Sequence, residues 1–466
     1  MSPLPAQYLS PLDNRYFAAV APIGEHLSEA ALNRARVKVE IEWLIQLTDL
    51  RMFGTEPLTT QQQQALRQVV SDFDQHAIDE LAEIEAVTKH DVKAVEYYVR
   101  ARLDELGLNA IAELTHFGCT SEDINNTSYA ITIRDAVEQV WLPAAIALVD
   151  QISAMAVAER AQPMLSLTHG QPATPTTLGK ELAVVAHRLR RQLRRIESQE
   201  YLGKWAGATG NFAAHLVSSP ETDWEAVAEQ FTGRLGLVWN PLTTQIESHD
   251  WQAELFGAVS HFNRILHNFC SDVWLYIMRG VFKQIPAPGA TGSSTMPHKI
   301  NPIRFENAES NLEMSCAVLD SLAHTLVTSR MQRDLTDSSS QRNIGVGFGH
   351  SLLAISNVAK GLDALAVNSE RLTEELDGNW EVLAEAIQTV IRAEKVAGRS
   401  SIDDPYAVLK ELTRGHTVGR DELIAFVDGL DISDAAKQRL RQLTPASYTG
   451  RSNGLVDRLR SSVASK

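Results

Sequence analysis

The sequence predicts a mainly α-helical fold built around a bundle of long helices. Apolar residues recur every three or four positions over long stretches, as in Leu182, Val185, Leu189, Leu193 and Ile196. Such a stripe buries one face of a helix against its neighbours. Few stretches alternate between apolar and polar residues, so we expect little β-sheet. Long helices joined by short polar breaks are typical of an antiparallel bundle.

Three regions follow from this pattern. Residues 1–110 mix helices with polar connectors and form the expected N-terminal helical domain. Residues 111–366 form the expected central domain, with long helices predicted near 131–160, 179–200, 252–283, 305–332 and 346–366. Residues 367–466 carry shorter helices and form the expected C-terminal domain. Helices this long often expose wide apolar stripes, which favours their burial in an oligomer.

Composition excludes several classes of protein. The chain has 43 Lys and Arg against 58 Asp and Glu, a net charge of −15, which disfavours nucleic-acid partners. No run of about 18 apolar residues occurs, so no membrane partner is expected. Three distant cysteines and a start without a signal-peptide pattern indicate a cytoplasmic protein. No P-loop, dinucleotide fingerprint or zinc motif occurs, so we expect no cofactor and no metal.

The segment 286–302, PAPGATGSSTMPHKINP, is the most unusual stretch of the sequence. Its glycines allow backbone conformations closed to other residues, and its prolines stop a helix. Composition alone fits a plain helix–helix connector as well as a functional lid. In the second interpretation, Ser293 could act as a base if backbone amides and the Lys299 ammonium stabilise its anion.

Two further motifs carry residues suited to proton transfer or anion binding. His169, within SLTHGQPAT, could protonate a leaving group, although a lone histidine is more often structural. Gly170 and Pro172 place this histidine at a break between helices. Thr120 or Ser121 would cap the helix that follows, and the amides at a helix N-terminus also bind anions.

Taken together, these motifs resemble the fumarase/aspartase superfamily. Residues 292–302 match its signature loop, Gly-Ser-Ser-x-Met-Pro-x-Lys-x-Asn-Pro, which is highly specific. Within the superfamily, residues 168–174, 89–92 and 120–123 resemble adenylosuccinate lyases, above all the bacterial purine-biosynthetic type. The resemblance runs from about residue 9 to the C-terminus. It implies a three-domain fold whose central helix bundle assembles into a tetrameric core, with active sites shared between subunits of a homotetramer.

The resemblance also implies a reaction. Its members remove fumarate by anti β-elimination from adenylosuccinate, giving AMP, and from the succinylaminoimidazole-carboxamide ribotide of purine biosynthesis. By this match, Ser293 is the base that takes the Cβ proton, and His169 is the acid that protonates the departing nitrogen. His90 would support His169, and Glu306 would partner the catalytic histidine. Lys299 would hold a substrate carboxylate.

The substrate-binding residues that the resemblance implies fall into two groups. The succinyl end would be held by Lys299 and Asn301, with Thr120, Ser121, Gln245 and Ser294 as further ligands. The phosphate and nucleotide end would be clamped by Arg15, Tyr16, Arg333, Ser338 and Arg342. Lys89, Asp91 and Asn307 complete the predicted set. Lys89 and Gln341 depart from the residue types expected at their positions.

Two alternatives remain at the level of sequence. One is another lyase or cyclase of the superfamily, acting for example on argininosuccinate. Arg15, Arg333 and Arg342 argue against it, because a small dicarboxylate needs no phosphate clamp. The other is a non-catalytic structural protein, like the crystallin relatives of this superfamily. The presence of Ser293 and His169 argues against that.

Overall fold

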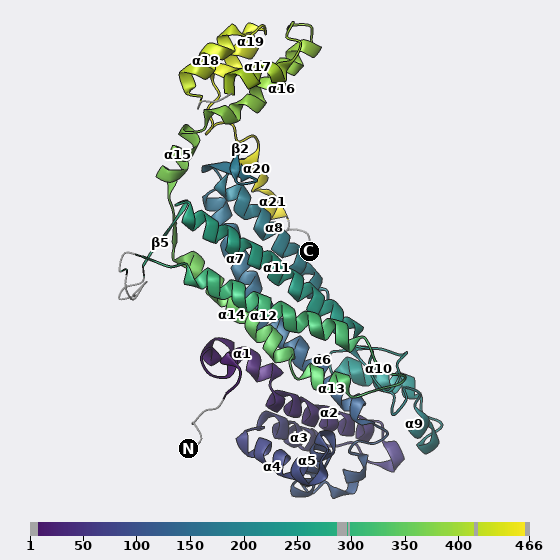
Figure 1. Ribbon diagram of the computed structural model, residues 1–466. Helices are drawn as coiled ribbons and strands as arrows, with labels where there is room; N and C mark the ends of the chain where they lie inside the picture. Colours follow the sequence, from purple (N-terminus) through teal and green to yellow (C-terminus); the bar gives the residue numbers. More distant parts are fainter. Residues whose placement is uncertain (1–7, 287–295, 297–298, 414–417, 462–466) are drawn as a thin grey trace. The chain divides into compact units, whose positions relative to one another are not determined.

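The computed structural model describes residues 8–286, 296, 299–413 and 418–461 (Figure 1). The predicted mainly helical fold is confirmed there, with three two-stranded sheets in addition. The chain divides into two compact units. Unit 1 comprises Met1–Ala145, Gln192–Arg264 and Ser310–Ser356, and unit 2 comprises Ile146–Arg191, Ile265–Glu309 and Asn357–Lys466. The division into three domains stays a prediction.

The five predicted long helices are present as five long helical segments. The boundaries between the two units fall inside α-helices of these segments. The first segment joins α6, the π-helical turn η4 and α7, so it begins about ten residues earlier than expected. The other four agree with the prediction within a few residues. Their bounds are Ser121–Ala136 for α6, Val137–Trp141 for η4, Leu142–Ala158 for α7, Leu178–Glu197 for α8, Asp250–Met278 for α11, Ile303–Leu326 for α12 and Ile344–Asp363 for α14.

The other elements of unit 1 are shorter. Its helices are η1 (Pro11–Asp13), α1 (Phe17–Leu27), α2 (Glu29–Asp49), η2 (Met52–Gly54), α3 (Thr60–Ser71), α4 (Gln75–Thr88), α5 (Asp91–Glu105), η3 (Asn109–Leu114), α9 (Ala213–Ser218), α10 (Trp224–Arg234) and α13 (Thr336–Gln341). Its parallel strands are β3 (Leu202–Gly203) and β4 (Val238–Trp239).

Helix α2 is the centre of unit 1, where it packs against α5 and α6 (Figure 1). Fifteen of its residues are buried, so it is surrounded on all sides. Trp43 lies edge-on to Trp205 and Phe231, with ring centroids 4.9 and 5.0 Å away. The same helix buries the charged residues Arg36 and Glu40. Buried charges need partners, which places a polar cluster inside this unit.

The other elements of unit 2 are the sheets β1–β2 and β5–β6 and a set of short helices. Their bounds are Pro163–Thr168 for β1, Gln171–Thr177 for β2, Phe282–Gln284 for β5, Leu365–Val367 for β6, Ser369–Asp377 for α15, Trp380–Leu383 for η5, Ala384–Val396 for α16, Pro405–Thr413 for α17, Arg420–Gly429 for α18, Asp434–Arg441 for α19, Ser452–Leu455 for α20 and Arg458–Ser461 for α21. Helices α16–α19 share one apolar core (Figure 1).

One helical segment, Ser121–Ala158, is long and apolar enough to cross a membrane, with a mean hydropathy of 1.7 in its most apolar window. A core helix of a soluble protein meets the same criteria. Glu122 and Asp123 lie in its first turn and are buried.

Candidate functional site

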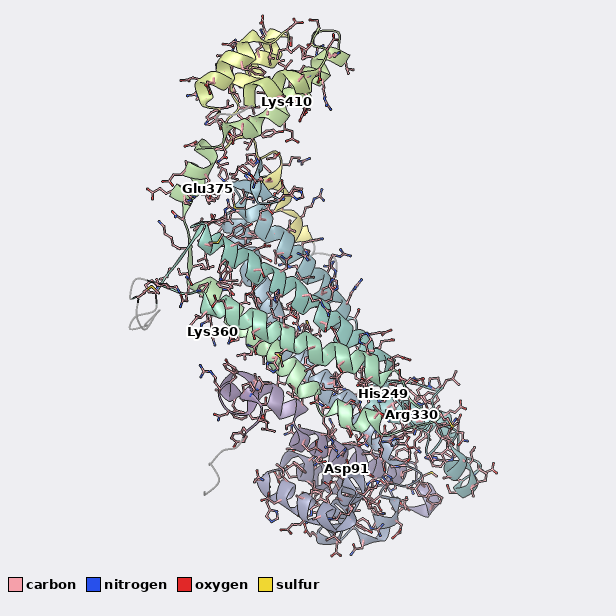
Figure 2. The ribbon with its side chains drawn as sticks, viewed as in Figure 1. Asp91, His249, Arg330, Lys360, Glu375 and Lys410 are labelled. Carbon is pink, nitrogen blue, oxygen red and sulfur yellow. The ribbon has the colours of Figure 1, made fainter. Side chains whose placement is uncertain are left out.

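Asp91, the first residue of α5 and labelled in Figure 2, binds two guanidinium groups in unit 1. Its Oδ2 atom accepts from Arg36 Nη2 at 2.9 Å and from Arg342 Nη2 at 3.4 Å. Arg342 also pairs with Glu29, in the first turn of α2. Partial burial raises the pKa of Asp91, but Arg36 and the backbone N–H of Val92 outweigh it, so the pKa lies below its usual value. Asp91 is therefore a carboxylate near neutral pH.

From Arg36 the polar contacts continue to two more of the predicted substrate residues. Arg36 Nε donates to Asn125 Oδ1 at 2.9 Å, and Asn125 Nδ2 donates to Glu122 Oε1 at 3.0 Å. The same Glu122 oxygen lies 3.1 Å from Arg333 Nη2, and Arg333 Nη1 donates to Gln245 Oε1 at 3.4 Å. Burial raises the pKa of Glu122, and the neighbouring Arg333 counteracts this rise. We call this connected set of side chains the polar network. Its members are Arg342, Asp91, Arg36, Asn125, Glu122, Arg333 and Gln245.

A buried ion pair fixes the turn at Thr120 and Ser121. Asp123 and Lys204 are both fully buried, and Asp123 Oδ1 lies 2.8 Å from Lys204 Nζ. Asp123 also accepts from the backbone N–H of Thr120 at 2.8 Å and of Ala206 at 2.9 Å. These bonds offset the cost of burying the carboxylate. They fix the first turn of α6, to which Glu122 belongs. Binding of an anion by the amides of this turn stays a prediction.

Lys89 and His90 form the junction between α4 and α5. Lys89 ends α4 in the left-handed conformation, with φ of 54°. His90 is the N-cap of α5, and its Nδ1 accepts from the backbone N–H of Lys93 at 3.2 Å. A neutral ring that accepts at Nδ1 carries its proton on Nε2. The His90 side chain is 51% exposed, so it can present this Nε2–H group to a ligand.

The remaining predicted residues of unit 1 lie outside the polar network. Arg15 is exposed just before α1, with its guanidinium 5.8 Å from the ring centroid of Tyr16. Ser338 lies in α13, where its backbone N–H donates to Asp337 Oδ1 at 2.6 Å. Among the described residues, no contact joins Arg15, Lys89 or Ser338 to the network.

His169 lies at the tip of the β1–β2 hairpin in unit 2, and not at the expected break between helices. Thr168 pairs with Gln171, so His169 and Gly170 form a two-residue turn. Their φ angles are 54° and 72°, as a type I′ turn requires at both central positions. The Thr-His-Gly-Gln sequence is thus a hairpin turn, and its histidine is exposed on this chain.

The predicted signature loop is described only in part. Ser293 and Ser294 lie outside the described residues. Lys299 is exposed, and its backbone N–H donates to Met296 O at 3.0 Å. Asn301 follows, and Pro302 precedes the first residue of α12.

Glu306 and Asn307 lie in the first turns of α12. Glu306 Oε1 accepts from Trp274 Nε1 at 3.2 Å, and Asn307 Oδ1 accepts from Asn357 Nδ2 at 2.9 Å. The bond observed for Glu306 is thus to a tryptophan, while its predicted partner is a histidine.

The predicted residues therefore divide between the two units. The nucleotide-end residues, with Asp91, His90, Thr120, Ser121 and Gln245, belong to unit 1. His169, Lys299, Asn301, Glu306 and Asn307 belong to unit 2. The described parts of the chain contain no group of three or more His, Cys, Asp or Glu placed to hold a metal ion.

Several buried polar residues near these positions were not predicted as site residues. Arg36, Glu122 and Asn125 connect the polar network, and Lys204 sets the turn beneath it. Charged residues recur along α2, but nothing in the sequence distinguishes Arg36 from Arg34 or Lys38.

Two further histidines of unit 1 have shifted pKa values: His249 is buried, and the His116 side chain is 18% exposed. Burial lowers the pKa of His116, but a 2.6 Å hydrogen bond to Glu40 outweighs it and raises the pKa above its usual value. His249 (Figure 2) lies 3.9 Å from Asp337, and burial together with Arg333 lowers its pKa to about 4. The raised pKa of His116 thus favours its protonated form beside Glu40, whereas His249 is neutral at pH 7.

Comparison with known proteins gives a consistent result. A family model described as Lyase matches residues 15–319, and one described as Adenylosuccinate lyase C-terminal matches residues 329–449. The chain is 48% identical over 459 residues to adenylosuccinate lyase of Escherichia coli K12, covering 97% of this chain and 98% of the relative. Adenylosuccinate lyase of Haemophilus influenzae is 47% identical over 453 residues, with the same coverage.

Two solved structures share the fold. 3-Carboxy-cis,cis-muconate lactonizing enzyme from Pseudomonas putida is 21% identical with a TM-score of 0.74, covering 97% of this chain and 98% of its own. Fumarate lyase from Mesorhizobium sp. BNC1 is 17% identical with a TM-score of 0.75, covering 94% and 97%. Likeness at this identity shows the fold alone, whereas the family models and the relatives identify the family. The chain belongs to the adenylosuccinate lyase family of the fumarase/aspartase superfamily.

Proposed function

We propose that this chain removes fumarate from adenylosuccinate, giving AMP, and from the succinylaminoimidazole-carboxamide ribotide, giving the aminoimidazole-carboxamide ribotide. The observation that carries the proposal is the polar network, which places Arg342, Asp91, Arg333 and Gln245 in one connected set in a member of this family.

The charge of this network suits a nucleotide substrate. Such a substrate carries a phosphate and two carboxylates, and the chain as a whole is acidic, so local cations must attract it. Arg333 and Arg342 have planar guanidinium groups that match phosphate and carboxylate oxygens. Glu122, Glu29 and Asp91 fix these guanidinium groups before a ligand arrives. This preorganisation lowers the entropic cost of binding.

The elimination itself would use residues of unit 2 together with His90 of unit 1. Ser293 takes the proton from the Cβ carbon, and the electron pair left there forms a dianionic aci-carboxylate. Lys299 and Asn301 stabilise that charge. The carbon–nitrogen bond then breaks, and His169 gives its proton to the departing nitrogen. His90 supports His169, and Glu306 is the acidic partner of the catalytic histidine.

We propose further that the protein is a cytoplasmic homotetramer whose active sites combine residues of different subunits. The exposure of His169 and His90 supports this, because acid–base groups gain most of their effect when water is excluded. Large apolar side chains exposed on α11 and α12 also favour burial between subunits: Leu275, Met278 and Met314. The net charge of −15 disfavours nucleic acid and anionic membranes as partners.

A fumarate-release assay tests the proposed reaction. Purified protein is given adenylosuccinate without added metal or cofactor, and fumarate and AMP are measured together. We expect both products in equal amounts. Argininosuccinate serves as the comparison substrate, and turnover of argininosuccinate with none of adenylosuccinate would favour another lyase of the superfamily.

A further inference from the structure

A cavity with basic residues in its lining lies in unit 1, among helices α1, α2, α3 and α6. Its volume is about 280 Å³, close to the lower end of the range for small-molecule sites, ~300–1,000 Å³. Three basic side chains line it: His26 from α1, and Arg34 and Lys38 from α2. None of the residues that line it belongs to the candidate site described above.

The charge of the cavity is positive within an acidic protein. Lys38 Nζ has no hydrogen-bond or ion-pair partner among the described residues. Arg34 donates one N–H to Glu25 O at 2.6 Å and keeps others for a ligand. The lining also holds Asp135, but this carboxylate is already paired with Arg134 Nη2 at 2.8 Å. Arg34 and Lys38 therefore bring more positive charge to the lining than the one carboxylate of Asp135 offsets.

The geometry of α2 separates this cavity from the polar network. Arg34 and Lys38 are four residues apart and share one face of the helix. Arg36 lies two positions from each of them, which turns it by about 200° around the helix axis. Arg36 takes part in the polar network from that opposite face. Arg34 and Lys38 thus line the cavity from one face of α2, whereas Arg36 faces the other way. His26 and Thr132 also line a small neighbouring cavity of about 30 Å³, together with Glu29 and Arg342.

The polar groups of the lining suit phosphate oxygens. An ammonium and a guanidinium supply charge-assisted hydrogen bonds, which are the strongest that side chains offer to phosphate. The hydroxyl groups of Ser71 and Thr132 lie in the same lining. Each donates its proton to a backbone carbonyl, of Arg67 at 3.3 Å and of Tyr129 at 3.1 Å, so their oxygens are left to accept from a ligand hydroxyl. Partial burial lowers the pKa of His26, so its neutral ring can donate or accept a hydrogen bond there.

We propose that this cavity binds a phosphate-bearing small molecule, at a site distinct from the substrate's. A single phosphate fills only part of the space, so the ligand class is a pyrophosphate or a sugar phosphate. Arg34 and Lys38 hold the phosphate, His26 can donate to a further phosphate oxygen, and the Thr132 and Ser71 oxygens accept from a sugar hydroxyl.

Titration calorimetry on the full chain tests this proposal, with inorganic pyrophosphate, inorganic phosphate and ribose 5-phosphate as probes at constant ionic strength. The variants are Lys38→Gln and the double change Arg34→Gln with Lys38→Gln. The control is Lys410→Gln with Arg420→Gln, two exposed cations far along the chain whose loss changes the net charge equally (Figure 2 labels Lys410).

We expect the native chain and the control to bind pyrophosphate or ribose 5-phosphate equally well. The double variant should bind at least about tenfold more weakly, while turnover of the substrate stays unchanged. Tighter binding of ribose 5-phosphate identifies a sugar phosphate as the ligand class, and tighter binding of pyrophosphate identifies a polyphosphate. The proposal is wrong if both variants bind every probe as the native chain does, or if the native chain binds none. Lys38→Gln alone decides the matter if the double variant fails to fold, because Lys38 has no partner to lose.

Discussion

One oxygen of Asp91 accepts hydrogen bonds from two guanidinium groups. The negative charge of this residue therefore contributes more to stability than its shape does. Arg36 is only 1% exposed and cannot turn to water for a replacement partner. An isosteric amide keeps the side chain's size but leaves a buried cation without its counter-ion. The cost of an uncompensated buried charge exceeds that of an ordinary lost hydrogen bond.

Asp91→Asn should therefore lower the free energy of unfolding by about 1–3 kcal/mol, measured by urea denaturation at pH 7. The control is Glu113→Gln, which removes an exposed carboxylate from its pair with Arg100 and should have no measurable effect. Equal losses in the two variants would contradict the role assigned to Asp91.

The same variant has a predictable pH dependence. Because the folded pKa of Asp91 lies below its reference value of 3.8, its stabilising contribution is fully present above pH 3.8. The contribution is lost as the pH falls through the folded pKa. The stability difference between the native chain and Asp91→Asn should thus be constant from pH 7 to pH 5 and shrink below pH 4. A difference that grows in acid would contradict this assignment.

His169 carries a conformational cost that its proposed role explains. The left-handed conformation disfavours most side chains, whereas asparagine tolerates it. His169→Asn should raise the melting temperature slightly and abolish fumarate release. His187→Asn, at an exposed position within α8, should leave both the melting temperature and turnover unchanged, because the two residues have similar helix propensities. Normal fumarate release by His169→Asn would show that the acid lies elsewhere.

At the scale of elements, apolar periodicity predicted the long helices well because each buries a stripe of regular spacing. The stripe of α8 from Leu182 to Ile196 is buried as expected. The β1–β2 hairpin was missed for two reasons. A register shift between Met164 and Ser166 interrupts its alternation. Its apolar residue Leu165 packs against Leu376 and Val382, which lie too far along the chain for a local pattern to reveal.

The beginning of α6 is an element whose geometry depends on the Asp123–Lys204 pair. Lys204→Met keeps the length of the side chain but leaves the Asp123 carboxylate buried without its cation. Breaking a buried pair in this way costs about 3–5 kcal/mol of stability, measurable by urea denaturation. Lys180→Met breaks the partly exposed pair with Glu181, so it should cost less than about 1 kcal/mol. A similar loss of stability in both variants would show that burial of the Asp123–Lys204 pair does not increase its contribution to stability.

For the whole molecule, the superfamily could be predicted from motifs in the sequence. The residues that match these motifs lie in both compact units. Asp91, Arg333 and Arg342 are predicted substrate residues, and the structure joins them in one network. Arg36 and Asn125, which connect them, could not be found from motifs. Their role depends on contacts between α2, α5 and α6 that no short pattern encodes.

Sites shared between subunits make a direct prediction for mixtures of inactive variants. Ser293→Ala and His169→Asn, unfolded together and refolded as one sample, should regain part of the native turnover. Some sites in mixed oligomers would combine an intact serine with an intact histidine from another subunit. Each variant refolded alone is the control and should stay inactive. A mixture as inactive as the controls would place both residues of a site on the same subunit.

The polar network also constrains how such a chain can change over generations. Loss of Asp91 alone would leave the Arg36 and Arg342 cations facing each other, so most first steps away from this arrangement are harmful. Neutral drift at these positions then requires coordinated replacements. An exposed pair such as Arg51 and Glu56 carries no such restriction, and either member can vary alone. Because of these buried contacts, we expect substitutions at several positions far apart in the sequence to occur together.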